Sequence, residues 1–558
     1  MDLPLSAEEL QEVRPSMFEE CFGSGPFIFR INENGVGPQL LTQVCLERGW
    51  REYTSENDNW NLWWRTTGFP VSHHKSIYSW QYLNHIPKGA AICRKDNLVR
   101  YLRCMKKVYG SIYDFSPHGY NLPLEYTKLA AECSRGRDAT HKFLDEKPIW
   151  ICKPVAQSQG RGIFLFRKLS ELNYDTNTIV QRYIEKPLLI GGYKFDLRLY
   201  VCIPSYHPVT IYMYREGLAR FGTDKFNLND LRNPFRHLTN YSINKLGPGF
   251  TEMKDRVGSG TRKKILSRIS DWLLWQRITT LVILTVLSHV SQIPPTVNCF
   301  EFFGFDVLID NSLRPWLLEV NLSPALSNDC DADRLVKKPM LHDMFDLIGL
   351  PLYNTGLSVF DIFSDEPKEN ARQVIETTEP AKLSLKNTVN VVNAAGRWRR
   401  KHKKMSASQS SRSNSAARPR SRTASASNQK TFMNLPKVQV DGRSIGATVG
   451  SITTPGTKLV DEDVRKPDYK IWGNGRNWKY ATPREGGWVR IWPIDVSSNG
   501  INDPSNSGYV KAMVNKMTKF TKTAKDLARK HPAASESQLS EYLQEEMNIT
   551  GDVWIPPV

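Results

Sequence analysis

The sequence has nine cysteines, but no two of them form a CxxC pair. Their number is odd, and they are scattered through apolar runs, as Cys152 and Cys202 are. This pattern is typical of reduced thiols in the core of a cytosolic protein. The cysteines and histidines also lack the spacing of a paired nucleophile and base, so no catalytic triad is predicted.

The sequence also lacks an obvious targeting or membrane-spanning segment. Its first residues, MDLPLSAEEL, contain no basic region followed by an apolar one, as a signal peptide would. The longest apolar run, Ile278 to Val290, is interrupted by Thr, Ser and His and is well short of the roughly 20 residues that span a bilayer. We expect a buried helix there, no membrane span, and a cytoplasmic protein.

Basic residues are in clear excess over acidic ones. The 558 residues carry a formal net charge of +18, which indicates an anionic partner such as nucleic acid, anionic lipid or an acidic protein surface. Arg397 to Lys430 contains eleven Lys and Arg and no Asp or Glu, and it cannot bury enough apolar surface to fold alone. It is either a solvated linker or a binding arm. No nucleic-acid-binding motif accompanies it, so nucleic acid is not the expected partner.

Composition divides the chain into five regions, and the first two are rich enough in apolar residues to bury a large core. The first has a strand candidate at 26–31 and a basic helix candidate at 96–108. The predicted regions are an N-terminal and central region at 25–140, a catalytic core at 141–350, a linker at 351–395, a basic Ser-rich arm at 396–430 and a C-terminal extension at 431–558.

Three segments outside the chemical motifs have interpretable patterns. Leu335, Met340, Leu341, Met344 and Leu347 recur at helical spacing and predict a helix that closes the core. Tyr469 to Pro493 holds four Trp and is expected to dock on the catalytic body. Ser505 to Lys530 predicts an amphipathic helix whose apolar stripe packs on that body or whose lysines lie on a negative surface.

The segment from Phe300 to Pro324 reads as two apolar strands joined at a turn around Asn311 and Ser312. Glu319 and Asn321 alternate onto one face, and such a turn would place Asp306 opposite Leu317 on that face. A carboxylate among apolar residues is costly unless it meets a cation, and oxygen ligands without His or Cys suit Mg²⁺. The alternative is a surface hairpin with incidental charges.

A strand lysine and a glycine turn predict a phosphate site. The strand that ends at Lys153 is followed by Gln159-Gly160-Arg161-Gly162, whose glycines would let backbone N–H groups approach phosphate oxygens. A lysine at the root of the turn supplies a point charge for the same phosphates. An ordinary β-turn beside a surface lysine is the alternative.

Two further strands carry polar residues. Lys194, Asp196 and Arg198 alternate with apolar residues, which predicts either one wall of a polar cleft or a solvent-facing strand side, and Arg220 ends a later strand. The strand at 179–184 is followed by a proline turn that could present backbone groups to an adenine edge. The run at 237–245 offers Thr, Asn, Tyr and Ser for hydrogen bonds to a small polar ligand.

Taken together, these features are the equipment for activating a carboxylate with ATP. Cations would hold the phosphates, a metal site would neutralise them, and an amine would then attack the acyl phosphate.

The order of the motifs resembles that of the tubulin tyrosine ligase-like family, and of its glutamylating branch in particular. The resemblance covers about residues 25–350. The upstream pairs Asn84-His85 and Leu122-Pro123 and the run Cys93 to Asp96 also look familial. The main matches are KP at 153–154, SQGRGI at 158–163, PLLI at 187–190, KFDLR at 194–198, LTNYSINK at 238–245, FD at 305–306 and EVN at 319–321.

The resemblance implies an α/β (α+β) fold with an ATP-grasp-type catalytic core, a preceding N-terminal domain and a largely disordered basic C-terminal extension. It implies Mg²⁺, as two ions, at Asp306, Glu319 and Asn321, and catalytic cations at Lys194, Arg198 and Arg220. The implied ATP contacts are Lys153, Gln159, Gly160, Arg161, Gly162, Gln181, Arg182, Tyr183, Ile184, Lys194, Phe195, Asp196, Thr239 and Asn240.

The resemblance also implies contacts to the incoming amino acid and to the protein substrate. Free L-glutamate would meet Arg220, Tyr241, Ser242, Arg262 and Lys337, and Gln159 would also contact the protein substrate. Lys337 follows Asn321 by sixteen residues, as in the glutamylating members. At the aligned place of Arg262 the family has a lysine, and this exchange is not neutral because guanidinium is planar and bulkier.

The implied reaction is ATP-dependent addition of glutamate to the γ-carboxylate of glutamates in the acidic C-terminal tails of tubulin. The negative tails and microtubule surface would be the partners of the +18 charge, with auxiliary subunits left open, and the implied location is the microtubule cytoskeleton, including the cilium or flagellum basal body. A glycine ligase, a ligase of another acceptor, and a catalytically weak microtubule-binding protein are the alternatives.

Overall fold

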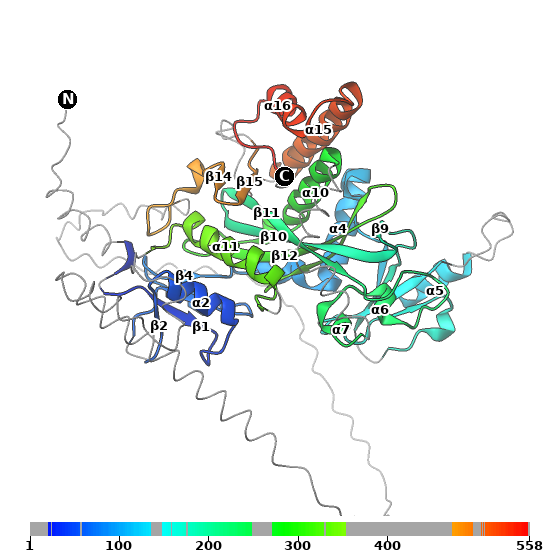
Figure 1. Cartoon of the computed structure of the whole chain (residues 1–558), viewed down its shortest axis with the longest axis horizontal. Coiled ribbons are helices and arrows are strands. Elements are labelled where there is room, and N and C mark those ends of the chain that lie inside the picture. Colours follow the sequence, from blue (N-terminus) through cyan, green and yellow to red (C-terminus); the bar gives the residue numbers. More distant parts are fainter. Residues whose placement is uncertain are drawn as a thin grey trace, which may run out of the picture. The chain divides into compact units, whose positions relative to one another are not determined.

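The computed structural model describes residues 21–135, 148–247, 271–352, 471–494 and 508–555, together with 504 and 506 and apart from gaps at 24, 56–57, 158, 175–176 and 329–330. All of these residues belong to one unit, which contains three β-sheets. The predicted mixed α/β class is confirmed (Figure 1).

The N-terminal sheet has four parallel strands in the order β2-β1-β3-β4. The strand expected at 26–31 is confirmed as β1, and the basic helix expected at 96–108 is confirmed as α4. The elements of this region are β1 (Ile28–Ile31), α2 (Gln39–Glu47), β2 (Arg51–Glu52), β3 (Leu62–Trp64), α3 (Val71–Lys75), β4 (Tyr82–Leu83), η1 (Gly89–Cys93), α4 (Lys95–Tyr109) and η2 (Gly110–Tyr113).

A second four-stranded sheet, in the order β5-β8-β6-β7, carries the predicted phosphate-binding lysine. Its pairs are antiparallel, and its core is small, built around Tyr120, Trp150 and Val180. The elements are β5 (Gly119–Leu122), α5 (Tyr126–Arg135), β6 (Trp150–Pro154), β7 (Phe164–Phe166), η3 (Leu169–Glu171) and β8 (Thr178–Arg182).

The central sheet has seven strands, six of them in the order β13-β12-β10-β11-β15-β14, with β9 paired to β10. Alternate residues of β10 enter two different cores: Leu199 and Val201 enter one, and Tyr200 and Cys202 enter the other. The elements are β9 (Leu189–Ile190), β10 (Tyr193–Tyr206), β11 (Val209–Phe221), α6 (Pro234–His237), α7 (Tyr241–Asn244), α10 (Trp272–Leu287), η4 (Val290–Gln292), β12 (Glu301–Ile309), β13 (Pro315–Asn321), α11 (Asp331–Leu347), η5 (Trp478–Tyr480), β14 (Arg484–Glu485), β15 (Trp488–Trp492), α15 (Tyr509–Lys530) and α16 (Glu536–Met547).

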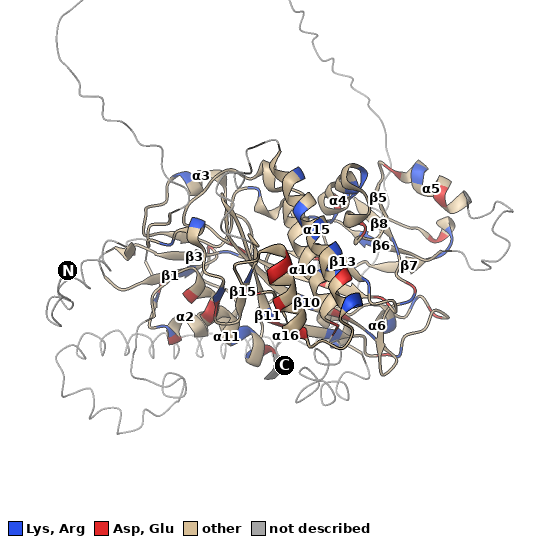
Figure 2. Cartoon of the chain, turned by 90° about the horizontal axis from the view of Figure 1, so that it is seen from above, with Lys and Arg blue, Asp and Glu red and all other residues tan. Residues whose placement is uncertain are grey.

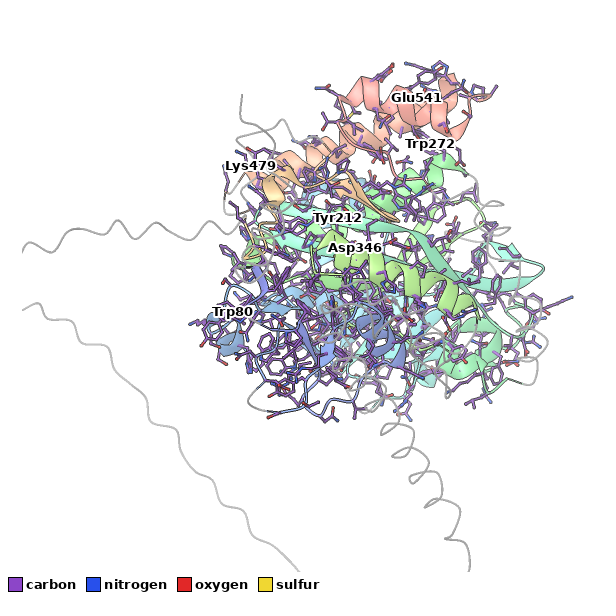
Figure 3. All side chains as sticks on the ribbon, turned by 60° about the vertical axis from the view of Figure 1, so that its left-hand side comes forward. Trp80, Tyr212, Trp272, Asp346, Lys479 and Glu541 are labelled. Carbon is purple, nitrogen blue, oxygen red and sulfur yellow. The ribbon has the colours of Figure 1, made fainter. Side chains whose placement is uncertain are left out.

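The buried helix predicted at 278–290 is confirmed as α10. Among the described residues, Trp272–Gln292 is the one stretch long and apolar enough to cross a bilayer, but 83% of its apolar window is buried inside the protein. It packs against the sheet and against α15 and α16 (Figure 1). Trp272 donates from Nε1 to the Ser540 hydroxyl at 2.9 Å, and Figure 3 shows Trp272 beside the helix that carries Glu541.

The other core lies between the central sheet, α2 and α11. The predicted helix around 335–347 is confirmed, and Met340, Leu341, Met344 and Leu347 are fully buried. Leu335 was expected in the same stripe, but it is 66% exposed, because the buried face of the helix passes through Val336 and Met340 instead.

The expected docking of the Trp-rich segment is confirmed, and the segment also adds a strand to the central sheet. Strand β15 hydrogen-bonds along β11 and carries Trp488 and Trp492 into the core. Residues 471–494 and 508–555 form strands and helices, so the prediction of a largely disordered C-terminal extension is wrong for them. Residues 353–395 of the linker predicted at 351–395, the arm at 396–430 and residues 431–470 lie outside the described residues.

Candidate active site

The functional side chains form a charged strip across four strands of the central sheet. On β10, Asp196 lies opposite Arg220 of β11, and Arg198 lies opposite Asp306 of β12. Asp306 in turn lies opposite Glu319 of β13. Directly paired residues share a face of the sheet, so the strip is one continuous surface.

The predicted register of the β12–β13 hairpin is wrong by two residues. Asp306 pairs with Glu319 and not with Leu317, because the turn is longer than expected and Leu318 forms a bulge. Without the bulge Asp306 would lie opposite Leu318, and Glu319 would face the other side of the sheet. The bulge therefore restores the predicted convergence of Asp306 and Glu319.

Two arginines neutralise the buried Asp306. Arg198 Nε lies 2.6 Å from Asp306 Oδ1, and Arg220 Nη2 lies 2.7 Å from Oδ2. Arg220 also binds Asp196 through two hydrogen bonds of 2.8 and 2.5 Å. Burial raises the pKa of Asp306, but the two guanidinium groups outweigh burial and hold that pKa well below its usual range.

Glu319 and Asn321 complete a set of oxygen-bearing side chains. Asn321 Nδ2 lies 3.3 Å from Asp306 Oδ2 and 3.5 Å from Glu319 Oε1. Burial, and then the charge of Asp306, raises the pKa of Glu319. Asp306 is buried and Glu319 is half-buried. Two carboxylates held this close together are the donors that a hard divalent cation such as Mg²⁺ prefers, so these residues fit the ion.

A half-buried lysine, Lys153, and a buried lysine, Lys194, face this strip. Lys153 of β6 donates to Gln181 Oε1 at 2.9 Å, and Lys194 of β10 donates to the Tyr183 hydroxyl at 2.9 Å and to the His237 carbonyl at 2.8 Å. Burial lowers the pKa of Lys153 to about 8 and that of Lys194 to about 7. An anion beside either lysine would favour its charged form.

The glycine turn packs against α7. Gln159 and Gly160 have positive φ angles of 61° and 80°, and Ser242 Oγ donates to the Gln159 carbonyl at 2.8 Å. A Cβ on Gly160 would lie 2.4 Å from Ile243 Cδ1 and 3.0 Å from Asn240 Oδ1. Only glycine allows the turn to approach this closely.

One cleft brings most of these residues together. Ile151, Ile184, Leu308 and Leu318 give it apolar walls that suit a planar ring. The predicted site residues that line it are Lys153, Gln159, Gly160, Gln181, Arg182, Tyr183, Ile184, Lys194, Asp196, Arg220, Thr239, Asn240, Asp306, Glu319 and Asn321.

Other predicted residues lie elsewhere. The side chain of Phe195 packs in the core behind the sheet, and Tyr241 is 42% exposed on α7. Lys337 is buried, pairs with Asp333 at 2.9 Å and donates to the Ser327 carbonyl at 2.9 Å.

Four more predicted residues lie near the cleft or outside the described chain. Arg198 adjoins the cleft through Asp306. Arg161 and Gly162 are the exposed part of the glycine turn, and Arg161 donates to Gln159 Oε1 at 3.3 Å. Arg262 lies outside the described residues.

The sequence reasoning missed Lys95. This lysine begins α4, lines the cleft, donates to the Gln157 carbonyl at 3.1 Å and lies 3.8 Å from Glu319 Oε2. Its position inside the familial run Cys93 to Asp96 was the available signal. Strand alternation could not reveal it, because it lies at the start of a helix.

Comparisons with known proteins show which families and proteins this sequence resembles. The profile of the "Tubulin-tyrosine ligase family" matches residues 72–355, just over half of the chain. "Probable tubulin polyglutamylase TTLL2" is 44% identical over 356 residues in Homo sapiens, covering 60% of this chain and 59% of the relative. The Mus musculus protein of that name is 43% identical, covering 62% and 66%. "Tubulin polyglutamylase TTLL6" of Mus musculus is 37% identical, covering 57% and 40%. The chain thus spans less than two thirds of these relatives.

Proposed function

The chain belongs to the tubulin-tyrosine ligase family, as its motifs predicted, and we propose that it is an ATP- and Mg²⁺-dependent ligase that adds glutamate to glutamates in the acidic tails of tubulin. The names of its relatives support tubulin as the protein substrate and glutamate as the added amino acid. The proposed location is the cytoplasmic microtubule cytoskeleton, including the cilium.

The observation that carries the proposal is a cleft lined by residues of two sheets. Lys153 comes from the β5-β8-β6-β7 sheet, and Lys194, Asp306 and Glu319 come from the central sheet. A nucleotide held between two sheets, with cations at its phosphates, is the arrangement expected of an ATP-grasp core. We assign that core on this basis.

The proposed reaction has two steps, and positively charged side chains of the cleft assist the first. The γ-phosphoryl group passes to the acceptor γ-carboxylate, which gives an acyl phosphate and ADP. The amine of free glutamate then attacks the acyl carbon, phosphate leaves, and the amine loses a proton as the amide forms. Lys194, Arg198 and Arg220 stabilise the charge on the transferred group.

Asp306, Glu319 and Asn321 would hold Mg²⁺, with two ions proposed, and the metal would neutralise the phosphates and help to align them. The remaining proposed nucleotide contacts are those that line the cleft, together with Arg161 and Gly162. Phe195 is not among them, because its side chain packs in the core behind the sheet.

The incoming glutamate is assigned to Arg220, Tyr241, Ser242, Arg262 and Lys337. Lys337 would hold the loop that ends at Ser327 in place, because its ammonium group donates a hydrogen bond to the Ser327 carbonyl oxygen. The glycine turn at Gln159 would meet the acceptor tail.

Glu319→Gln tests the site. We expect incorporation of labelled glutamate into tubulin to fall at least about 100-fold, because the variant removes one charge from the metal site. Glu545→Gln, exposed on α16, is the matched control and should match the wild type.

Equal incorporation by Glu319→Gln and the wild type would refute the site. Preference for glycine would indicate the glycylase alternative. If an auxiliary subunit is required and neither protein is active, Mg²⁺-dependent binding of ATP still tests the assignment, because it needs no acceptor.

A further inference from the structure

A second cavity lies on the far side of the strand that the nucleotide cleft uses. It is enclosed by α4, the segment 113–119, the turn between β12 and β13, and residues 182–186, and its volume is about 530 Å³. Ligand pockets of small molecules fall in this range. Residues 182–184 line both cavities, so the strand end separates them.

The floor of the cavity is apolar and aromatic. Leu102 and Val99 of α4 are buried, and Tyr113 and Trp316 add ring surfaces. Tyr113 is 1% exposed, and its hydroxyl makes no hydrogen bond to any described residue. A buried hydroxyl without a partner costs free energy, which a ligand acceptor would recover.

Several charges in the wall are already satisfied within the protein. Arg103 pairs with Glu125 at 2.9 Å, and Lys106 pairs with Asp114. Asp310 accepts from Ser312 Oγ at 2.6 Å and Trp316 Nε1 at 2.9 Å.

Two cations at the rim are left for a ligand. Arg182 and Lys186 are exposed, and neither pairs with a carboxylate of the described residues. Arg182 lies over the Trp150 ring, with Cζ 5.7 Å from the ring centroid. An anion at this rim would meet both side chains without displacing an existing ion pair.

We infer that this cavity binds a small aromatic anion, with its ring between Leu102 and Trp316, an acceptor atom at the Tyr113 hydroxyl, and its carboxylate or phosphate at Arg182 and Lys186. Because residues 182–184 also line the cleft, the ligand changes the affinity for nucleotide. This coupling rests on the proposed function, whereas the binding itself does not.

Titration calorimetry of the full chain with 2-naphthoate and 2-naphthyl phosphate tests the binding. We expect saturable binding in the micromolar to millimolar range, about tenfold weaker for Lys186→Gln and several-fold weaker for Tyr113→Phe. Lys107→Gln, exposed on α4 and outside the cavity wall, should bind as the wild type does.

The two probes distinguish a carboxylate site from a phosphate site by their relative affinity. Absence of saturable binding, equal loss in Lys107→Gln and Lys186→Gln, or equal affinity for neutral 2-naphthamide would overturn the proposal.

Repeating the titration with saturating Mg²⁺-ATP measures the coupling, which must be reciprocal. An unchanged affinity would overturn the coupling while the cavity still binds its ligand. Loss of ATP binding in the protein would instead count against the proposed function, so the two failures are separable.

Discussion

At the scale of single residues, the cleft contains charges that compensate one another. Arg198 and Arg220 both bind Asp306, and Arg220 also binds Asp196. Alternation along β10 predicted that Asp196 and Arg198 share a face. Their partners on β11 and β12 depend on strand register, which cannot be read from the sequence.

Arg198→Met should lower the free energy of unfolding by about 3–5 kcal/mol, because it leaves Asp306 buried with one guanidinium fewer. Urea denaturation measures the change. Arg529→Met removes an exposed pair with Asp526 and should cost less than about 1 kcal/mol. A similar small loss for both variants would contradict the compensation argument.

The lowered pKa of Lys194 predicts a pH dependence of nucleotide binding. Burial holds this pKa at about 7, so the free protein carries mostly neutral Lys194 at pH 8.5. Anionic phosphates favour the charged form, so binding takes up a proton and weakens as pH rises from about 7 to 9. Lys153, with a pKa of about 8, acts in the same direction.

Calorimetry at pH 8.5 in HEPES and in Tris measures the proton uptake. Lys194→Arg should take up fewer protons, because arginine stays charged. Identical uptake by the variant and the wild type would assign the proton to another group.

At the scale of elements, sequence periodicity predicted which face of a helix or strand is buried, but it did not predict how the strands pair. The apolar stripe of α15 is confirmed, with Met513, Met517 and Phe520 buried. The bulge at Leu318 was not predictable, because Leu fits a regular strand equally well. The pairing of β15 with β11 was also invisible, since the two strands are separated by more than 250 residues.

Gly160→Ala should raise the KM for ATP about tenfold, because the new Cβ would push the turn away from Asn240 and Ile243. Gly35→Ala is the control: Gly35 also has a positive φ, of 70°, but no atom lies within 4 Å of its added Cβ. Steady-state kinetics and denaturation of both variants separate a local effect from backbone strain. An equal KM for both would contradict the close-packing argument.

At the scale of the whole molecule, the charge of +18 concerns partners rather than the fold. Blue segments mark basic residues on α4 and α15 in Figure 2. The excess itself could be read from composition, but its placement on the folded body could not, because burial decides which charges face solvent.

Deletion of residues 396–430 removes eleven of the positive charges and should weaken pelleting with microtubules at low salt. The loss should shrink as salt rises, while Mg²⁺-ATP binding stays unchanged. Pelleting that is unaffected at low salt would exclude the arm from binding.

The pairing of β15 with β11 also sets an order of events during synthesis. Residues 209–221 leave the ribosome long before residues 488–492, and until the latter arrive one edge of β11 remains open to wrong partners. A premature stop codon between 356 and 487 would therefore preserve every residue of the cleft and still yield an unfinished sheet. Such truncations would fail through misassembly, not through loss of a catalytic group.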